Sequence, residues 1–82
     1  MEPKYTIRLL PAGNGFNVEI DRQFVIGAIT TPAQTWGVAL VPGADLDAPL
    51  SCMWEGDTEI TPISLAEMFP AEYAYLKAKL GA

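Results

Sequence analysis

Residues 4–20 read KYTIRLLPAGNGFNVEI, and this stretch decides the fold. Apolar and polar residues alternate on both sides of a glycine-rich centre, which is the period-two pattern of strands with one buried face. The residues expected on the buried face are Tyr5, Ile7, Leu9, Phe16, Val18 and Ile20. Residues 11–15 supply turn chemistry between the strands, with the pair Asn14-Gly15 suited to a positive φ. The sequence therefore predicts an antiparallel hairpin at the start of the chain.

Working outward, the next elements rest on shorter signals. Asp21-Arg22-Gln23 is a polar tripeptide and is predicted to form a second tight turn. Residues 24–29 are apolar without alternation, which predicts a third strand with both faces covered and hence a central position.

Residues 30–41 fit two interpretations. Thr31 as N-cap, Pro32 in the first turn and Gln34 reaching back would form a capping box, which predicts a short helix ending near Leu40. In the alternative, residues 31–34 form a turn and residues 35–41 a fourth strand. Gly37 disfavours the helix by about 1 kcal/mol relative to alanine. The aromatic and β-branched residues around Gly37 prefer strands, so the strand is favoured and the helix stays open.

The second half of the chain follows a similar pattern and ends in a helix. Residues 42–49 are predicted to form an acidic loop, 50–54 a strand, 55–57 a turn and 58–63 a returning strand at a sheet edge. Ser64 and Glu67 form a second capping box, and Pro70 divides a one-turn helix from a main helix that Gly81 ends. One apolar stripe is expected on the helical region, at Phe69, Tyr73, Leu76 and Leu80.

These elements predict an α+β fold. We expect a small curled antiparallel sheet of about five or six strands, arranged as a meander or open barrel, with a C-terminal α-helix packed on it. The 82 residues, of which 50% are hydrophobic, are enough for a single compact domain over 1–82 with one core. Phe16, Phe24 and Trp36 are expected to fill that core.

Charge is distributed unevenly along the chain. Residues 23–76 contain no Lys, Arg or His, and the net charge is −5. Within that stretch residues 23–44 hold no acid either, so the carboxylates concentrate at Asp45 and Asp47, at Glu55 to Glu59, and at the start of the last helix. A surface of this kind predicts a basic partner, a protein or nucleoprotein complex. It argues against direct binding of nucleic acid or of an anionic membrane.

The chain lacks the residues or motifs that several kinds of catalytic and binding site require. The chain has no histidine, which excludes catalytic triads and imidazole acid–base catalysis. Gly13-Asn14-Gly15 lacks the third glycine of a dinucleotide-binding loop, and the acidic loops lack the spacing of a calcium loop. Cys52 is the single cysteine and is expected to be a buried, inert thiol. The sequence predicts no enzyme and no cofactor or metal.

Size and charge together favour a non-enzymatic protein-binding module in the cytoplasm, most simply an inhibitor that occludes a basic, nucleic-acid-binding surface. Small acidic inhibitors of phages and mobile elements, some anti-CRISPR proteins among them, offer an analogy of size and charge. Two alternatives stay open: an assembly subunit of a phage particle or other homo-oligomeric complex, and an antitoxin or immunity-type protein. The residues predicted to bind a partner are Asp45, Asp47, Trp54, Glu55, Asp57, Glu59, Glu67, Glu72 and Tyr75.

Overall fold

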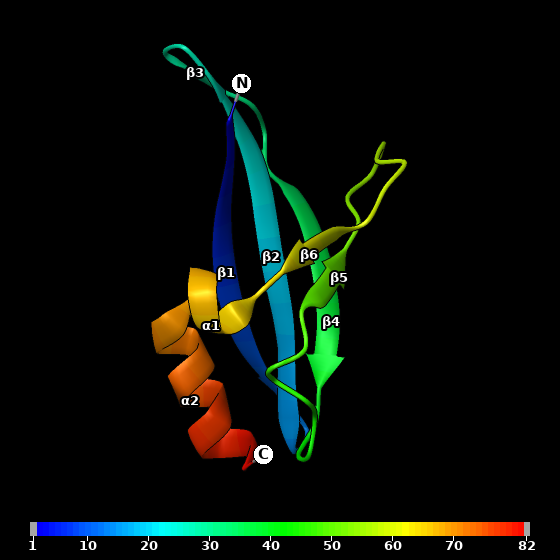
Figure 1. Cartoon of the computed structure of the whole chain (residues 1–82), viewed down its shortest axis with the longest axis vertical. Coiled ribbons are helices and arrows are strands. Elements are labelled where there is room, and N and C mark those ends of the chain that lie inside the picture. The colour runs from blue at the N-terminus through cyan, green and yellow to red at the C-terminus, as the bar shows by residue number, and fades with distance from the viewer. Residues whose placement is uncertain (1, 82) are drawn as a thin grey trace.

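The fold consists of an antiparallel sheet with two helices and a smaller sheet packed on one of its faces (Figure 1). The structure is a computed structural model and describes residues 2–81. The main, four-stranded sheet contains β1 (Glu2–Ala12), β2 (Gly15–Ile26), β3 (Ile29–Thr30) and β4 (Gln34–Leu40). The second sheet pairs β5 (Leu50–Cys52) with β6 (Thr61–Ile63), and α1 (Leu65–Met68) and α2 (Pro70–Leu80) follow. The α+β class is confirmed, and the strands do not close into a barrel.

The predicted hairpin is β1 paired with β2, in unbroken register from Glu2 opposite Val25 to Ala12 opposite Gly15. The turn differs from the expected one. Gly13 has a φ of +58° and Asn14 does not have a positive φ, so the turn is centred one residue earlier than Asn14-Gly15. Gly at the first central position is the requirement of a type II′ turn, whose twist matches that of the strands. Gly15 is therefore released from the turn and is the first residue of β2.

Residues 21–23 do not form a turn, and the predicted central strand over 24–29 is wrong. β2 continues through Arg22 to Ile26, and the chain reverses at Gly27, which has a φ of +61°. The physical reason is that Arg22 is on the buried side of β2, in phase with Ile20 and Phe24. Because Arg22 is charged, the sequence around it has the polar composition of a turn, although the strand continues through it.

The strand favoured for the ambiguous segment is confirmed as β4, which pairs with β2 from Gln34 opposite Arg22 to Leu40 opposite Phe16. A bulge separates β4 from β3. Thr31 bonds to Phe24, with 2.9 Å from the Thr31 amide to the Phe24 carbonyl, so Pro32 and Ala33 are opposed by a single residue of β2. Without this extra residue the register would place Ala33, not Gln34, opposite Arg22. The bulge therefore sets which residues of β4 face the core.

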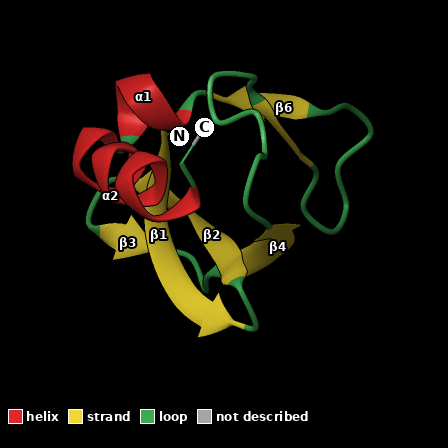
Figure 2. Cartoon of the chain, turned by 90° about the horizontal axis from the view of Figure 1, so that it is seen from below, coloured by secondary structure: helices red, strands yellow, loops and turns green. Residues whose placement is uncertain are grey.

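The main sheet has an inner face, covered by the helices and the β5–β6 sheet, and an outer face open to solvent (Figure 2). Val18 and Ile20 of β2 are fully buried on the inner face. They belong to a core that also contains Leu40, Leu46, Cys52, Trp54, Ile63, Leu65, Leu76 and Leu80. On the outer face, the Arg8 guanidinium forms ion pairs with Glu19 and Asp21.

The helical region forms as the sequence predicts. The Ser64 hydroxyl accepts a hydrogen bond from the Glu67 amide at 3.3 Å, and Pro70 begins α2 after a one-turn α1. Gly81 ends α2 in the left-handed conformation, with a φ of 65°. Leu76 and Leu80 of the predicted stripe are buried, and Phe69 and Tyr73 pack against the core. The strands predicted at 50–54 and 58–63 are shorter, because residues 53–60 leave the ladder as a loop.

We expect Gly15→Ala to destabilise the fold strongly. A Cβ atom at Gly15 would lie 2.1 Å from the carbonyl oxygen of Leu40, a backbone atom that cannot move without displacing β4. Overpacking of this kind lowers the free energy of unfolding by at least about 2 kcal/mol, measurable by urea denaturation.

The matched control is Gly37→Ala on β4. The nearest atoms to a Cβ there are at 3.7 and 3.8 Å, which is ordinary contact, so its effect should stay below about 1 kcal/mol. Equal losses in the two variants would contradict the close approach of Gly15 to Leu40.

Candidate functional site

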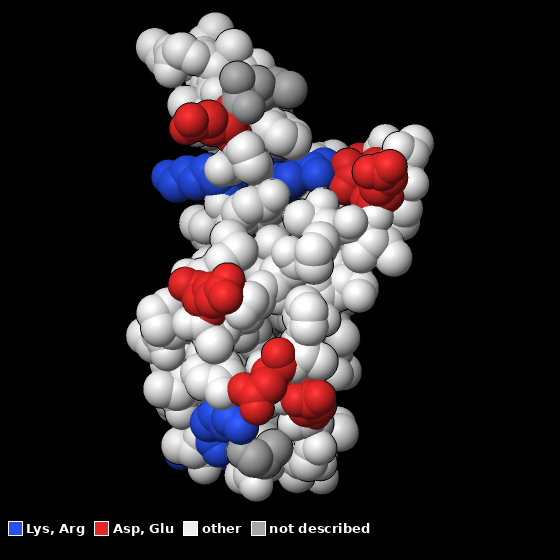
Figure 3. Space-filling view, viewed as in Figure 1, with Lys and Arg blue, Asp and Glu red and all other residues white. Residues whose placement is uncertain are grey.

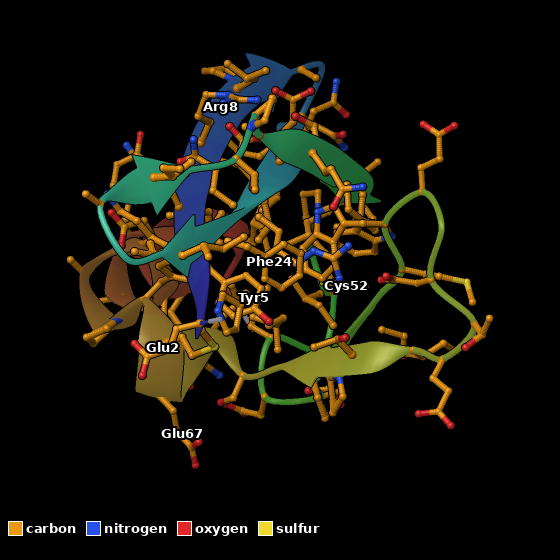
Figure 4. All side chains as sticks on the ribbon, turned by 90° about the horizontal axis from the view of Figure 1, so that it is seen from above. Glu2, Tyr5, Arg8, Phe24, Cys52 and Glu67 are labelled. Atoms are coloured by element: carbon orange, nitrogen blue, oxygen red, sulfur yellow. The ribbon has the colours of Figure 1, made fainter. Side chains whose placement is uncertain are left out.

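Arg22 is the one charged residue buried within residues 2–81, with 7% of its surface exposed. β2 places its guanidinium on the inner face of the sheet, between two aromatic rings. The guanidinium carbon lies 4.9 Å from the ring centroid of Phe24 and 4.6 Å from that of Trp54. Figure 4 shows Phe24 and Tyr5 turned into this region, while Arg8 lies on the opposite side of the sheet. The rings supply cation–π contacts but do not neutralise the charge.

Asp57 supplies the counter-charge from the loop between β5 and β6. Two parallel hydrogen bonds join the guanidinium to the carboxylate, from Nη1 to Oδ2 at 2.9 Å and from Nη2 to Oδ1 at 3.0 Å. Gln34 completes the set, because its Oε1 accepts from Arg22 Nη2 at 2.6 Å. Bidentate pairs of this type are the strongest and most directional ion pairs in proteins. Arg22 therefore fixes both β4 and the loop that carries Asp57.

The loop has four further attachments to the sheet and to itself. The Trp54 indole donates to the carbonyl of Ile20 at 3.1 Å, and the Gln34 side chain donates to the carbonyl of Glu55 at 2.9 Å. The Trp54 amide donates to Asp57 Oδ2 at 3.1 Å, and the Asp57 amide donates to the Trp54 carbonyl at 3.0 Å. These contacts hold residues 54–57 in one conformation on the rigid sheet.

Residues 53–60, which include this anchor, form a projecting segment that we call the 53–60 loop. It extends away from the body beside β4 (Figure 1). Its side chains combine apolar and acidic character: Met53 is 44% exposed and Ile60 58% exposed, and the carboxylates of Glu55 and Glu59 are exposed. In the described part of the chain, neither carboxylate has a hydrogen bond or ion pair. The 53–60 loop thus presents exposed apolar side chains beside carboxylates that have no partner among the described residues.

The ionisation of Asp57 follows from its contacts. The hydrogen bonds from Arg22 lower its pKa below the ordinary value of 3.8, and the Trp54 amide lowers it further, against an opposing effect of burial. Asp57 is thus a carboxylate that is used inside the molecule. It is a predicted binding residue that the structure places in the anchor of the loop, with its charge already balanced.

Trp54 is also assigned to the anchor by the structure. It is 2% exposed, and its ring lies 5.6 Å from that of Tyr5. An exposed Trp54 that inserts into a partner is therefore not what the fold provides. Cys52 is fully buried nearby, so the predicted burial of its thiol is confirmed, and that burial raises its pKa to about 11.

The remaining predicted binding residues lie elsewhere. Asp47 accepts hydrogen bonds from the Tyr73 hydroxyl and from Lys77, and these contacts lower its pKa. Asp45 accepts from the amides of Asp47 and Ala48 and so closes its own loop. Figure 3 shows the acidic side chains of that face in separate groups with neutral surface between them. The nine predicted residues do not form one continuous acidic face.

The two helices carry the last three. Glu67 is exposed on α1 and points away from the body in Figure 4. Glu72 is half-buried on α2, and Tyr75 is 46% exposed. Its ring meets that of Phe16 edge-on at 5.7 Å. These residues lie beside β1, away from the 53–60 loop.

Arg22 and Gln34 are the site residues that sequence reasoning missed. For Arg22 the signal was present in the alternation of β2, because Phe16, Val18, Ile20, Arg22 and Phe24 keep one phase.

Within residues 2–81, no group of three or more Asp, Glu or Cys side chains is placed to hold a metal ion. No helix in the described part of the chain is long and apolar enough to span a bilayer. No family model, curated protein sequence or solved structure matches the chain.

We expect Arg22→Met to lower the free energy of unfolding by about 3 kcal/mol, because it leaves the Asp57 carboxylate without its partner. Urea denaturation measures the loss, and amide hydrogen exchange should show residues 53–57 opening first. The matched control is Arg8→Met, which removes a guanidinium with two ion-pair partners from the open face. Its effect should be much smaller, since exposed pairs contribute little. Equal losses in the two variants would refute the anchoring role of Arg22.

The Arg22–Asp57 pair also predicts a pH dependence. Because the folded pKa of Asp57 lies below its unfolded value, the pair stabilises the protein above about pH 4 and this contribution is lost as the pH falls through the folded pKa. A carboxyl NMR titration should give Asp57 a midpoint below 3.8 in the natural chain and a higher midpoint in Arg22→Met. An unchanged midpoint would show that the guanidinium does not set this pKa.

Proposed function

We propose that this protein is a non-enzymatic protein-binding module whose 53–60 loop docks on a basic surface of a partner protein. The observation that carries the proposal is the loop itself, which is anchored at its base by Arg22 and presents Glu55, Glu59, Met53 and Ile60 to solvent. Pre-organisation of this kind reduces the entropy lost on binding, so that more of the contact energy appears as affinity.

The charge balance supports a basic partner. The ion pairs of Arg8, Arg22 and Lys77 engage Glu19, Asp21, Asp57 and Asp47, which leaves the remaining acids to determine the surface. With a net charge of −5, these unpaired carboxylates attract a positively charged protein and repel nucleic acid. Basic surfaces of that type commonly bind nucleic acids, so a module that covers one would act as an inhibitor by occlusion.

The composition of the 53–60 loop supports binding that is selective for one partner as well as electrostatically favoured. Glu55 and Glu59 steer the approach, and Met53 and Ile60 supply apolar area that becomes buried on contact. Met53 has an unbranched, polarisable side chain that adapts to an irregular surface. Charge alone would bind many basic proteins, whereas the combination selects a basic surface with an apolar centre.

The test uses the tagged chain to recover binding proteins from its native cells, followed by affinity measurements on the recovered partner. We expect a basic partner whose affinity falls steeply between about 50 and about 500 mM salt. Glu59→Lys should weaken binding by at least about tenfold, because it replaces an attraction by a repulsion.

The matched control is Glu2→Lys, which makes the same charge change at an exposed residue of β1. It should leave the affinity close to that of the natural chain. A partner whose affinity is independent of salt, or which responds equally to the two variants, would overturn the role proposed for the 53–60 loop.

A further inference from the structure

β1 is an edge strand with a free side. It pairs with β2 alone, and within residues 2–81 no other segment forms a hydrogen bond to its backbone. The register shows which groups face outward. Phe24 directs its carbonyl to Thr31, away from β1, so Phe24 and the residues two apart along β2 are the non-hydrogen-bonded partners of β1. The residues of β1 opposite them therefore direct their amides and carbonyls to the free edge.

The residues with outward-facing backbone are Pro3, Tyr5, Ile7, Leu9 and Pro11. Proline has no amide hydrogen, so Pro3 and Pro11 close the two ends of the free edge. Between them, the amides and carbonyls of Tyr5, Ile7 and Leu9 form a row with strand spacing. This row can accept an extended segment of about five residues, and the prolines prevent pairing from extending further.

A groove borders the same edge on the inner face. Its volume is about 380 Å³, and it lies between β1 and α2, lined by Leu9, Pro11, Phe16, Ala71, Glu72 and Tyr75. We call it the β1–α2 groove. The helices lie over the β1 side of the sheet and extend past its edge in both views (Figures 1 and 2). A strand added to β1 would therefore run beneath α2, with alternate side chains directed into the groove.

The groove has apolar walls and a single acid. Glu72 has no hydrogen bond or ion pair among the described residues, and Tyr75 is held edge-on against Phe16. Lys79 Nζ lies 5.6 Å from the Tyr75 ring centroid. A Lys or Arg side chain matches both properties, because its stem packs on apolar surface while its charged head reaches a carboxylate.

We propose that the free edge of β1 and the β1–α2 groove form a peptide-binding site. An extended segment of a partner protein adds to the sheet as an extra strand and places a Lys or Arg side chain in the groove, against Glu72. Main-chain hydrogen bonds to Tyr5, Ile7 and Leu9 give affinity, and the groove gives sequence preference. This second surface is separate from the 53–60 loop and does not depend on it.

A second copy of the chain is a poorer occupant of this edge. Pairing of β1 with β1 of another copy would be related by a two-fold axis. Because α1 and α2 of each copy extend past the edge on the same face, the helices of the two copies would meet in the space that the new strand needs (Figure 2). A single extended segment avoids this collision, and the acidic groove favours a basic one.

The experiment selects ligands from a random heptapeptide library displayed on phage, with the full chain immobilised. We expect enrichment of peptides with Lys or Arg flanked by strand-forming residues. An enriched peptide is then synthesised and added to the ¹⁵N-labelled chain. In the free chain the amides of Tyr5, Ile7 and Leu9 should exchange rapidly and those of Thr6 and Arg8 slowly. At saturation, the first three should slow by at least about tenfold, because only strand addition protects alternate amides of β1.

Two variants test whether the peptide binds in the β1–α2 groove. Glu72→Gln keeps the size of the side chain and should weaken the peptide about three- to tenfold, whereas Glu59→Gln should leave it unchanged. A peptide with N-methyl groups on the alternate amides that face β1 should lose binding.

The proposal is overturned if no peptide is enriched, if protection appears at amides other than those of Tyr5, Ile7 and Leu9, or if binding depends on Glu59 and not on Glu72. Since the 53–60 loop is tested by Glu59→Lys and its own partner, failure at one surface is distinguishable from failure at the other.

Discussion

The placement of β4 and of the 53–60 loop on the sheet depends on the pairing of one buried charge. Arg22 lies in the inner face of the sheet, where an unpaired guanidinium would carry a large desolvation cost. The fold meets that requirement with Asp57, Gln34 and two aromatic rings. Each of these partners fixes another part of the molecule. Gln34 requires the bulge that shifts the register of β4, and Asp57 requires the loop between β5 and β6 to fold back on the sheet. Compensation of the Arg22 charge thus constrains the register of β4 and the position of the loop that carries Asp57.

The number of carboxylates in the chain overstates how acidic the surface is, because several of them are paired with cations of the same molecule. Hydrogen bonds from Arg8 and from Arg22 lower the pKa values of Asp21 and Asp57, and hydrogen bonds from the Tyr73 hydroxyl and then Lys77 lower the pKa of Asp47. The carboxylates outside these ion pairs lie in separate groups, on β1, in the loop between β4 and β5, on the 53–60 loop and on the helices; Figure 3 shows such separate groups on one face. Each group has different neighbours: apolar side chains around the loop, and an apolar groove beside Glu72. Local composition, more than net charge, distinguishes these surfaces.

Local patterns predict the elements that depend on local physics. The alternation in residues 4–20 gives the hairpin, and the capping box at Ser64 with the glycine at 81 gives the helical region. The errors occur where a distant residue decides. Arg22 resembles a turn residue until Asp57, 35 positions away, compensates its charge. Trp54 resembles an exposed anchor until the carbonyl of Ile20 accepts its indole hydrogen. The candidate loop was identified by its acids, but its anchored base could not be, because no short-range signal links residues 22, 34 and 57.

The sequence separation of these contacts has a consequence for how the molecule assembles. The β1–β2 hairpin closes through a two-residue turn, so it loses little loop entropy and can form early. The contact between Arg22 and Asp57 must wait until β4, the 41–49 loop and β5 are in place. We therefore expect the 53–60 loop to fold late, on a sheet that is already formed. Local opening of that loop would expose its backbone to proteolysis while the hairpin and its register remain intact.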